Sequence, residues 1–198
     1  KLHLCHCSTA DSVALVRFGK SLGVRLSAEV CPHHFAMTED DIPGDDANYK
    51  MNPPLRARAD VDALIAGLSD GPMEVIATDH APHSAEEKKR SFLDAPFGIV
   101  GSETAFALSY TALVKAGHLT LPQLVEKLSV NPARILGIDK GDISVGHTAD
   151  LVVADVEHPY VIDVEKLISK GKNSRFGGRT VYGKIELTMV NGEVVYEA

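Results

Sequence analysis

Histidine and aspartate residues gather at three places in this sequence, each close to the end of a short apolar segment. These residues are His3 and His6, then His33 and His34, and then the Asp-His-Ala-Pro-His run at 79–83. Imidazole and carboxylate groups are good ligands for zinc and similar divalent ions. The sequence has no compact zinc motif such as HExxH or a CxxC pair, so each histidine taken alone fits a structural or surface role better than that of a ligand. Three such groups together favour a metal site if the apolar segments are strands ending at one edge of a sheet.

Four further residues have both a chemical and a purely structural interpretation. Asp79 is suited to bind a metal or act as a general base, but an aspartate after a strand often only caps a turn. Asn52 offers amide groups to a polar ligand, or forms a turn before proline. Phe97 fits loop or core packing, and Gly98 permits either close backbone approach to a ligand or a turn.

The elements that would position these residues alternate between strand and helix. Apolar runs predict strands at 2–5, 25–30 and 74–78. A Ser-x-x-Asp start at Ser8 predicts a helix whose apolar face carries Leu15, Phe18 and Leu22 and which ends at Gly23. Further helices are predicted at 61–68, 102–116 and 121–128, with Asn131 capping another one. This rhythm predicts a parallel α/β sheet or barrel, and its long loops at 31–59 and 79–101 are where function usually lies.

The composition changes near Gly137. Beyond it, β-branched residues and glycine turns predict short strands, with a tight hairpin at Asn191-Gly192. The predicted strands are 149–154, 160–162, 180–182, 186–190 and 193–196. We therefore predict two domains, residues 1–137 and 138–198, the second a small β domain.

Composition excludes several classes of protein. The chain has 198 residues, of which 44% are hydrophobic, and a formal net charge of −7. It is too apolar for a disordered chain, and its apolar runs are far shorter than the roughly 20 residues of a membrane span. The acidic balance argues against nucleic-acid binding. Three cysteines do not make a disulfide framework, which favours the cytoplasm. Because the sequence begins within a strand pattern, we expect residues to precede Lys1.

Five segments resemble, in order and spacing, the signatures of the class I dihydroorotases of the amidohydrolase superfamily. They are Leu4-Cys-His6-Cys-Ser-Thr9, Glu29-Val-Cys-Pro-His-His34, Met51-Asn-Pro-Pro-Leu-Arg56, Thr78-Asp-His-Ala-Pro-His83 and Pro96-Phe-Gly-Ile-Val-Gly-Ser-Glu-Thr104. Residues 180–196 are similar to the closing segment of that family. The resemblance covers essentially the whole chain, although the segment at 78–83 is shared with hydantoinases and allantoinases.

The resemblance implies the carboxyl-terminal part of a (β/α)8 TIM barrel, with strands 6–8, and a small β-sandwich domain. The implied reaction is the reversible cyclisation of N-carbamoyl-L-aspartate to L-dihydroorotate in pyrimidine biosynthesis. It implies Zn²⁺, two ions per complete site, with His6 and Asp79 as ligands and Asp79 as the proton shuttle. Asn52, His83 and the segment Pro96, Phe97 and Gly98 would bind the substrate.

The chain departs from the family pattern in what it lacks. The His-x-His pair of strand 1, the bridging lysine or aspartate of strand 4 and the histidine of strand 5 are absent from it. A complete barrel needs roughly 200–250 residues. Two ligands cannot hold a zinc pair, so we expect this chain alone to be inactive. A smaller departure is Arg175, where the family pattern has proline; we expect little consequence.

Two alternatives remain open. One is another cyclic amidohydrolase, a hydantoinase or allantoinase. The other is a non-catalytic, dihydroorotase-like partner of aspartate carbamoyltransferase. We expect a small-molecule substrate and a homodimer.

Several other residues receive less specific predictions. Glu29 either points into the site or is structural, and Cys5 is expected to be a buried thiol. We expect His33 or His34 to be structural behind the site, and His3 to pack in the barrel or an interface. His118, His147 and His158 are predicted at the surface. The charge run at 86–90 is predicted to be a solvated helical turn.

Overall fold

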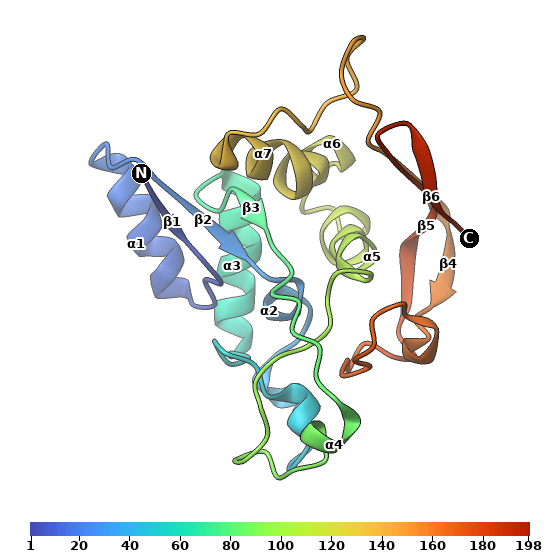
Figure 1. Cartoon of the computed structure of the whole chain (residues 1–198). Coiled ribbons are helices and arrows are strands. Elements are labelled where there is room, and N and C mark those ends of the chain that lie inside the picture. Colours follow the sequence, from blue (N-terminus) through green and yellow to red (C-terminus); the bar gives the residue numbers. More distant parts are fainter.

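The computed structural model of the chain describes residues 1–198 and begins with a three-stranded parallel sheet (Figure 1). Its strands are β1 (Leu2–Leu4), β2 (Leu26–Val30) and β3 (Val75–Ile76), in the order β1-β2-β3. All three predicted strands of this part are therefore confirmed, β3 being shorter than expected. Because the strands are parallel, their carboxyl ends lie at one edge of the sheet, as the sequence analysis required.

Helices α1 (Ala10–Ser21) and α3 (Arg58–Asp70) connect these strands and pack against each other. The side chain of Thr9, not Ser8, caps α1 by accepting a hydrogen bond from the backbone N–H of Ser12. The helix ends as predicted, with Gly23 at φ +75°. Glycine suits this position because it adopts the left-handed conformation without a steric penalty.

The apolar face expected on α1 is not the face that packs on the core of this chain. Leu15, Phe18 and Leu22 are each at least 60% exposed, whereas Val13 and Val16 are buried against the sheet and α3. Both sets of residues have helical spacing, so periodicity alone does not say which set faces the core. The structure places the shorter, β-branched side chains inside.

The two predicted long loops contain several short helices. These are α2 (Pro32–Ala36), η1 (Glu39–Asp41), η2 (Ala47–Tyr49) and α4 (Ala85–Lys88). The first three follow β2 and the last follows β3. Each loop therefore leaves the same edge of the parallel sheet and folds beside it (Figure 1).

The helices after the second loop are longer than their α-helical parts suggest. α5 (Ala105–Ser109) continues into the π-helical segment η3 (Tyr110–Lys115). α6 (Leu121–Val125) likewise continues through the π-helical segment η4 (Glu126–Val130) into α7 (Asn131–Leu136).

The capping box at Thr120 and Gln123 forms as predicted at the start of α6. The prediction that Asn131 caps a helix is wrong, because Asn131 lies within a continuous helical path. Its side chain instead donates a hydrogen bond to the carbonyl of Glu74, at 2.9 Å, and so ties this path to the start of β3.

The carboxyl-terminal part forms an antiparallel sheet in the order β4-β5-β6. Its strands are β4 (Leu151–Val161), β5 (Thr180–Val190) and β6 (Glu193–Glu197), with η5 (Val164–Lys166) after β4. Five short strands were predicted, but four of them are the ends of two long, bulged strands. The predicted hairpin is confirmed, since Asn191 and Gly192 both have positive φ, +52° and +82°.

Two hydrophobic clusters hold the chain together. The larger lies between the parallel sheet and its helices and includes Val16, Val30 and Leu64. The second joins Met51 and Leu108 to residues in and beside the antiparallel sheet: Ile162, Phe176 and Val181. The segment between β4 and β5 therefore packs on the loops that follow the parallel strands. None of the helices has the length and apolar content needed to cross a membrane.

Candidate metal and substrate site

His6 and Asp79 face each other at the carboxyl edge of the parallel sheet. His6 follows β1 and Asp79 follows β3, and His6 Nε2 lies 3.6 Å from Asp79 Oδ1. Both residues have a left-handed backbone, with φ of +54° and +47°. A non-glycine residue in this region costs on the order of 1–3 kcal/mol, and such residues concentrate at functional sites. The same unfavourable backbone turn thus aims both side chains at one point.

Glu29 holds the imidazole of His6 from the neighbouring strand β2. It is 7% exposed, and its Oε1 lies 2.9 Å from His6 Nδ1 and accepts a hydrogen bond from the His6 backbone N–H. Its other oxygen, Oε2, accepts a hydrogen bond from His3 Nε2 at 2.9 Å. A carboxylate beside Nδ1 favours the tautomer with its proton there, which leaves the Nε2 lone pair facing Asp79. Glu29 therefore contacts the site, and His3 supports Glu29.

The donor chemistry of His6 and Asp79 fits a divalent ion. An imidazole nitrogen and a carboxylate oxygen, 3.6 Å apart and partly exposed, are a suitable pair of ligands for zinc. Carboxylate–histidine support of the kind that Glu29 gives is typical of histidines that bind metals. A catalytic zinc site has about three protein ligands, so these two side chains would supply only part of such a site.

A buried cluster of Cys31, His33 and His34 lies behind His6. Cys31 Sγ is 3.4 Å from His6 Nδ1, and the rings of His33 and His34 lie 4.2 Å apart. Burial, above all, lowers the pKa of His34 to about 4 and the pKa of His33 well below its usual value. Burial and nearby carboxylates raise the pKa of Cys31, so the thiol and both imidazoles are neutral. Both histidines are buried beside His6, and the structural role expected for one of them stays a prediction.

One prediction about the neighbourhood of the site needs correction, because Cys5 was expected to be buried but is exposed. His80, which received no specific role, accepts hydrogen bonds at Nδ1 from the backbone N–H groups of Gly101 and Ser102. It acts as a local cap of the second loop.

His83 belongs to a second group of candidate residues, at the contact between two arms of the second loop, residues 79–84 and 96–101. Its Nε2 donates a hydrogen bond to the carbonyl of Phe97 at 2.8 Å. Gly98 has φ +124°, and a Cβ there would lie 2.4 Å from the Cβ of Ala81. Glycine is therefore required at 98 for backbone conformation and for space. The predicted residues at 83 and 96–98 are brought together by the fold.

Asn52 and Phe97 are both exposed. The peptide bond between Asn52 and Pro53 is cis, and the carbonyl of Pro53 accepts a hydrogen bond from His34 Nε2 at 2.8 Å. Asn52 is thereby linked to the buried cluster behind His6. Phe97 is 52% exposed, which contradicts the core-packing interpretation, and the ammonium of Lys50 lies 4.6 Å from its ring centroid.

Two buried lysines support the second group, and the sequence analysis missed both. Lys50 Nζ donates to the carbonyls of Leu93 and Ala95, at 2.7 Å each. Lys88 Nζ donates to the carbonyls of Ala47 and Pro96, at 2.9 Å each. Lys88 is 6% exposed, so the predicted solvated turn at 86–90 is wrong at this residue. Burial lowers the pKa of Lys88 to about 8.

The other histidines lie where they were predicted to lie. His118, His147 and His158 are exposed, as expected. His3 packs within the sheet, where its Nδ1 accepts a hydrogen bond from the Ser27 hydroxyl at 2.7 Å.

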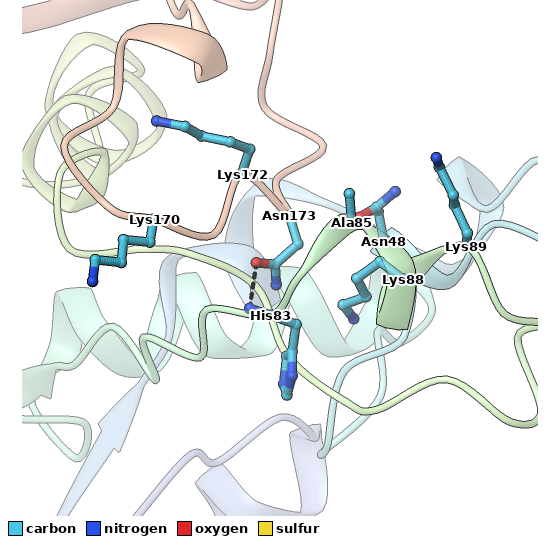
Figure 2. Close-up of a pocket in the computed structure, with 8 residues that line it drawn as sticks. All are labelled: Asn48, His83, Ala85, Lys88, Lys89, Lys170, Lys172 and Asn173. Atoms are coloured by element: carbon cyan, nitrogen blue, oxygen red, sulfur yellow. Dashed lines mark hydrogen bonds between the residues drawn. The ribbon is translucent and has the colours of Figure 1, made fainter.

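A pocket of about 290 Å³ lies beside the second group (Figure 2). Its lining includes His83, Asn173 and four lysines at 88, 89, 170 and 172. Figure 2 shows that the side chains of Lys89 and Lys170 point away from each other. The lysines therefore do not converge on one point. The more informative feature of this pocket is the contact between His83 and Asn173 in its lining.

Comparison with known proteins identifies the family of the chain. Residues 1–195 match the amidohydrolase family. Proteins named dihydroorotase are similar over almost the whole chain: that of Bacillus caldolyticus is 53% identical over 98% of this chain and 46% of its own length. The protein of that name from Clostridioides difficile is 49% identical over 100% of this chain and 47% of its own length. The chain spans about half the length of the curated relatives it matches.

Solved structures show the same arrangement of elements. The crystal structure of dihydropyrimidinase from Brevibacillus agri NCHU1002 superimposes with a TM-score of 0.93 at 27% identity, over 100% of this chain and 45% of that one. The L-hydantoinase of Arthrobacter aurescens gives a TM-score of 0.90 at 33% identity, over 98% of this chain and 44% of that one. With the family match over nearly every residue and these likenesses in fold, the chain belongs to the amidohydrolase family.

Proposed function

We propose that this chain is the part of a dihydroorotase that carries the last strands of its barrel and part of its active site. The observation that carries the proposal is the opposed pair of donor atoms, His6 Nε2 and Asp79 Oδ1, at the ends of two parallel strands. The similarity to proteins named dihydroorotase, at about 50% identity, supports the choice of reaction.

In this proposal β1, β2 and β3 are strands 6, 7 and 8 of a (β/α)8 barrel. Active sites of such barrels lie at the carboxyl ends of the strands, which is where His6 and Asp79 stand. The small domain at 138–198 would contribute its antiparallel sheet to a β-sandwich. The remaining strands, and the metal ligands expected on strands 1, 4 and 5, would come from residues outside this chain.

Zinc, two ions per complete site, is the metal that we propose for His6 and Asp79. When bound, zinc polarises a carbonyl and makes water more acidic. Glu29 fixes the imidazole of His6 so that Nε2 is available as a ligand. Such support usually affects metal affinity about 10- to 100-fold.

Asp79 is the residue that we assign to proton transfer. In the hydrolytic direction, water adds to the ring amide carbonyl of L-dihydroorotate, and the carbon–nitrogen bond breaks. The Asp79 carboxylate takes a proton from the attacking water and delivers it to the departing nitrogen. In the reverse direction, protonated Asp79 gives its proton to the oxygen that leaves N-carbamoyl-L-aspartate as water. Residues in such roles typically contribute 10²- to 10⁴-fold to the rate.

The substrate would be held by the second group of residues. His83 would bind the substrate carboxylate, and Asn52 with the backbone at Pro96, Phe97 and Gly98 would hold the ring. The loop contact between Ala81 and Gly98 supports this assignment, because it fixes the backbone beside His83. A homodimer, and an association with aspartate carbamoyltransferase, belong to the same proposal.

The test joins this chain to the part of Bacillus caldolyticus dihydroorotase that the match leaves uncovered, and measures turnover with zinc present. We expect hydrolysis of L-dihydroorotate by the hybrid, and none by this chain alone. The matched control is the hybrid with His6→Ala, which should fold but lose zinc and activity. Activity on hydantoin or allantoin without activity on dihydroorotate would contradict the proposal. A hybrid that binds aspartate carbamoyltransferase but takes up no zinc would favour a scaffolding protein.

A further inference from the structure

Asn173 lies between β4 and β5 in the sequence, yet its side chain is inserted between two arms of the second loop, residues 79–84 and 96–101. It is 5% exposed. Its Oδ1 accepts a hydrogen bond from the His83 backbone N–H at 2.8 Å (Figure 2). Its Nδ2 donates to the carbonyl of Ala81 at 2.9 Å and to the carbonyl of Gly98 at 3.1 Å. Its own carbonyl accepts from the Val100 N–H at 3.0 Å.

These contacts need the chemistry of an amide. The carboxamide presents one acceptor and two donor hydrogens at the end of a short stem, and all of these are used here. Aspartate has the same shape but no donor, and alanine has neither donor nor acceptor. Leaving a buried backbone carbonyl without a partner costs about 1–3 kcal/mol. The site therefore discriminates between side chains by hydrogen bonding as well as by volume.

The backbone segments around Asn173 are packed so closely that they have little room to rearrange. A Cβ at Gly171 would lie 2.9 Å from the backbone nitrogen of His83, and a Cβ at Gly98 would lie 2.4 Å from the Cβ of Ala81. Three stretches of chain thus meet in direct contact, one from each arm of the second loop and one from the carboxyl-terminal segment. The carboxamide of Asn173 bonds to both arms.

We propose that Asn173 is a positioning residue for substrate binding, which sets the place of His83 relative to the 96–98 segment. The inference rests on the proposed function, in which these residues hold the substrate. Asn173 bonds directly to His83 and Gly98, whereas His6 is held by Glu29. Loss of the carboxamide should therefore raise KM much more than it lowers kcat.

The first test does not depend on activity. Hydrogen exchange, read by mass spectrometry, is compared for the unchanged chain, Asn173→Ala, Asn173→Asp and the control Ser174→Ala. Ser174 is the buried neighbour whose hydroxyl accepts a hydrogen bond from the Phe176 N–H within the same segment. We expect faster exchange at 79–84 and 96–101 in both Asn173 variants, with exchange in β4–β6 unchanged. In Ser174→Ala, exchange at 79–84 and 96–101 should stay as it is in the unchanged chain.

The second test measures steady-state kinetics of the same variants in the hybrid protein. We expect KM for L-dihydroorotate to rise about 10- to 100-fold in Asn173→Ala, with kcat within about threefold. In Asn173→Asp, KM should rise at least as much, because a carboxylate oxygen, which can only accept, then faces the two carbonyl oxygens that had a donor. If the residue only filled space, the isosteric Asn173→Asp would behave like the unchanged protein, and that result would overturn the proposal.

The two tests separate failure of the inference from failure of the proposed function. A hybrid without dihydroorotase activity, together with faster exchange in both arms of the second loop in the Asn173 variants, contradicts the reaction and with it the substrate role, while it leaves the link between the two arms established. Unchanged exchange in both arms contradicts the link itself. A general loss of protection, with kcat and KM affected equally, would show that Asn173 acts only in folding.

Discussion

The two groups of candidate residues are held in place in different ways. His6 and Asp79 are placed by the ends of two strands, and Glu29 comes from the strand between them. His83 and Phe97 lie on the second loop, and their backbone is held by added side-chain contacts. Lys88 makes such contacts from within the same loop, and Lys50 and Asn173 make them from elsewhere in the chain.

This difference separates the part of the site that is built by the sheet from the part that is built by added contacts. A strand end is fixed by the backbone ladder, so it needs little else to place a side chain. A loop needs partners for its polar backbone groups, and buried lysine and asparagine side chains supply them here. Mutations should therefore damage the two groups in separable ways.

Asp79→Asn should have the largest effect on the first group. The amide keeps the shape of the carboxylate but cannot accept the proton, so we expect kcat of the hybrid to fall at least about 100-fold. Its stability should change little, because the side chain is partly exposed. Asp70→Asn, on the surface, is the matched control. Activity within tenfold of the unchanged protein would remove Asp79 from its assigned role.

The pH dependence of stability tests the packing of the buried cluster behind His6. The pKa of His34 is about 4 in the folded chain and about 6.5 when exposed, so the unfolded chain binds more protons between these values. Stability should therefore fall as the pH falls from about 6.5 to about 4, by up to about 3 kcal/mol. Urea denaturation over this pH range measures the loss, and His34→Phe should reduce it. An unchanged pH dependence in that variant would exclude His34 as the source.

Glu29→Gln should weaken metal binding without affecting the second group. The amide can no longer hold the Nδ1 proton of His6 as a carboxylate does, and we expect zinc affinity to fall about 10- to 100-fold. Competition with a chromophoric chelator measures this in the hybrid. Glu74→Gln, on the same sheet but away from the site, is the control. Equal zinc affinities in the two variants would show that His6 does not need Glu29.

Lys88→Met should act on the second group alone. The buried carbonyls of Ala47 and Pro96 would lose their donor, so the free energy of unfolding should fall by about 1–3 kcal/mol. Lys89→Met changes the exposed neighbour and should have almost no effect. Urea denaturation compares the two, and equal stabilities would show that the Lys88 contacts contribute nothing.

The sequence alone predicted the residues whose position depends on local structure. Strand patterns placed His6 and Asp79 at strand ends, and the hairpin at Asn191-Gly192 followed from turn chemistry. The resemblance to dihydroorotases also selected His83 and Gly98, which the fold brings together. These predictions needed only periodicity, turn residues and short motifs.

Tertiary structure decided the rest. The sequence left the orientation of Glu29 open, did not show which face of α1 is buried and placed Lys88 in solvent. It also gave no role to Asn173, whose partner His83 is 90 residues away. In each case the outcome depends on which surfaces meet, because helical periodicity, a charge run or a single asparagine has the same local pattern whether it is buried or exposed. Local sequence patterns therefore determine which strand ends carry the reactive side chains, and long-range packing determines which residues hold those side chains in place.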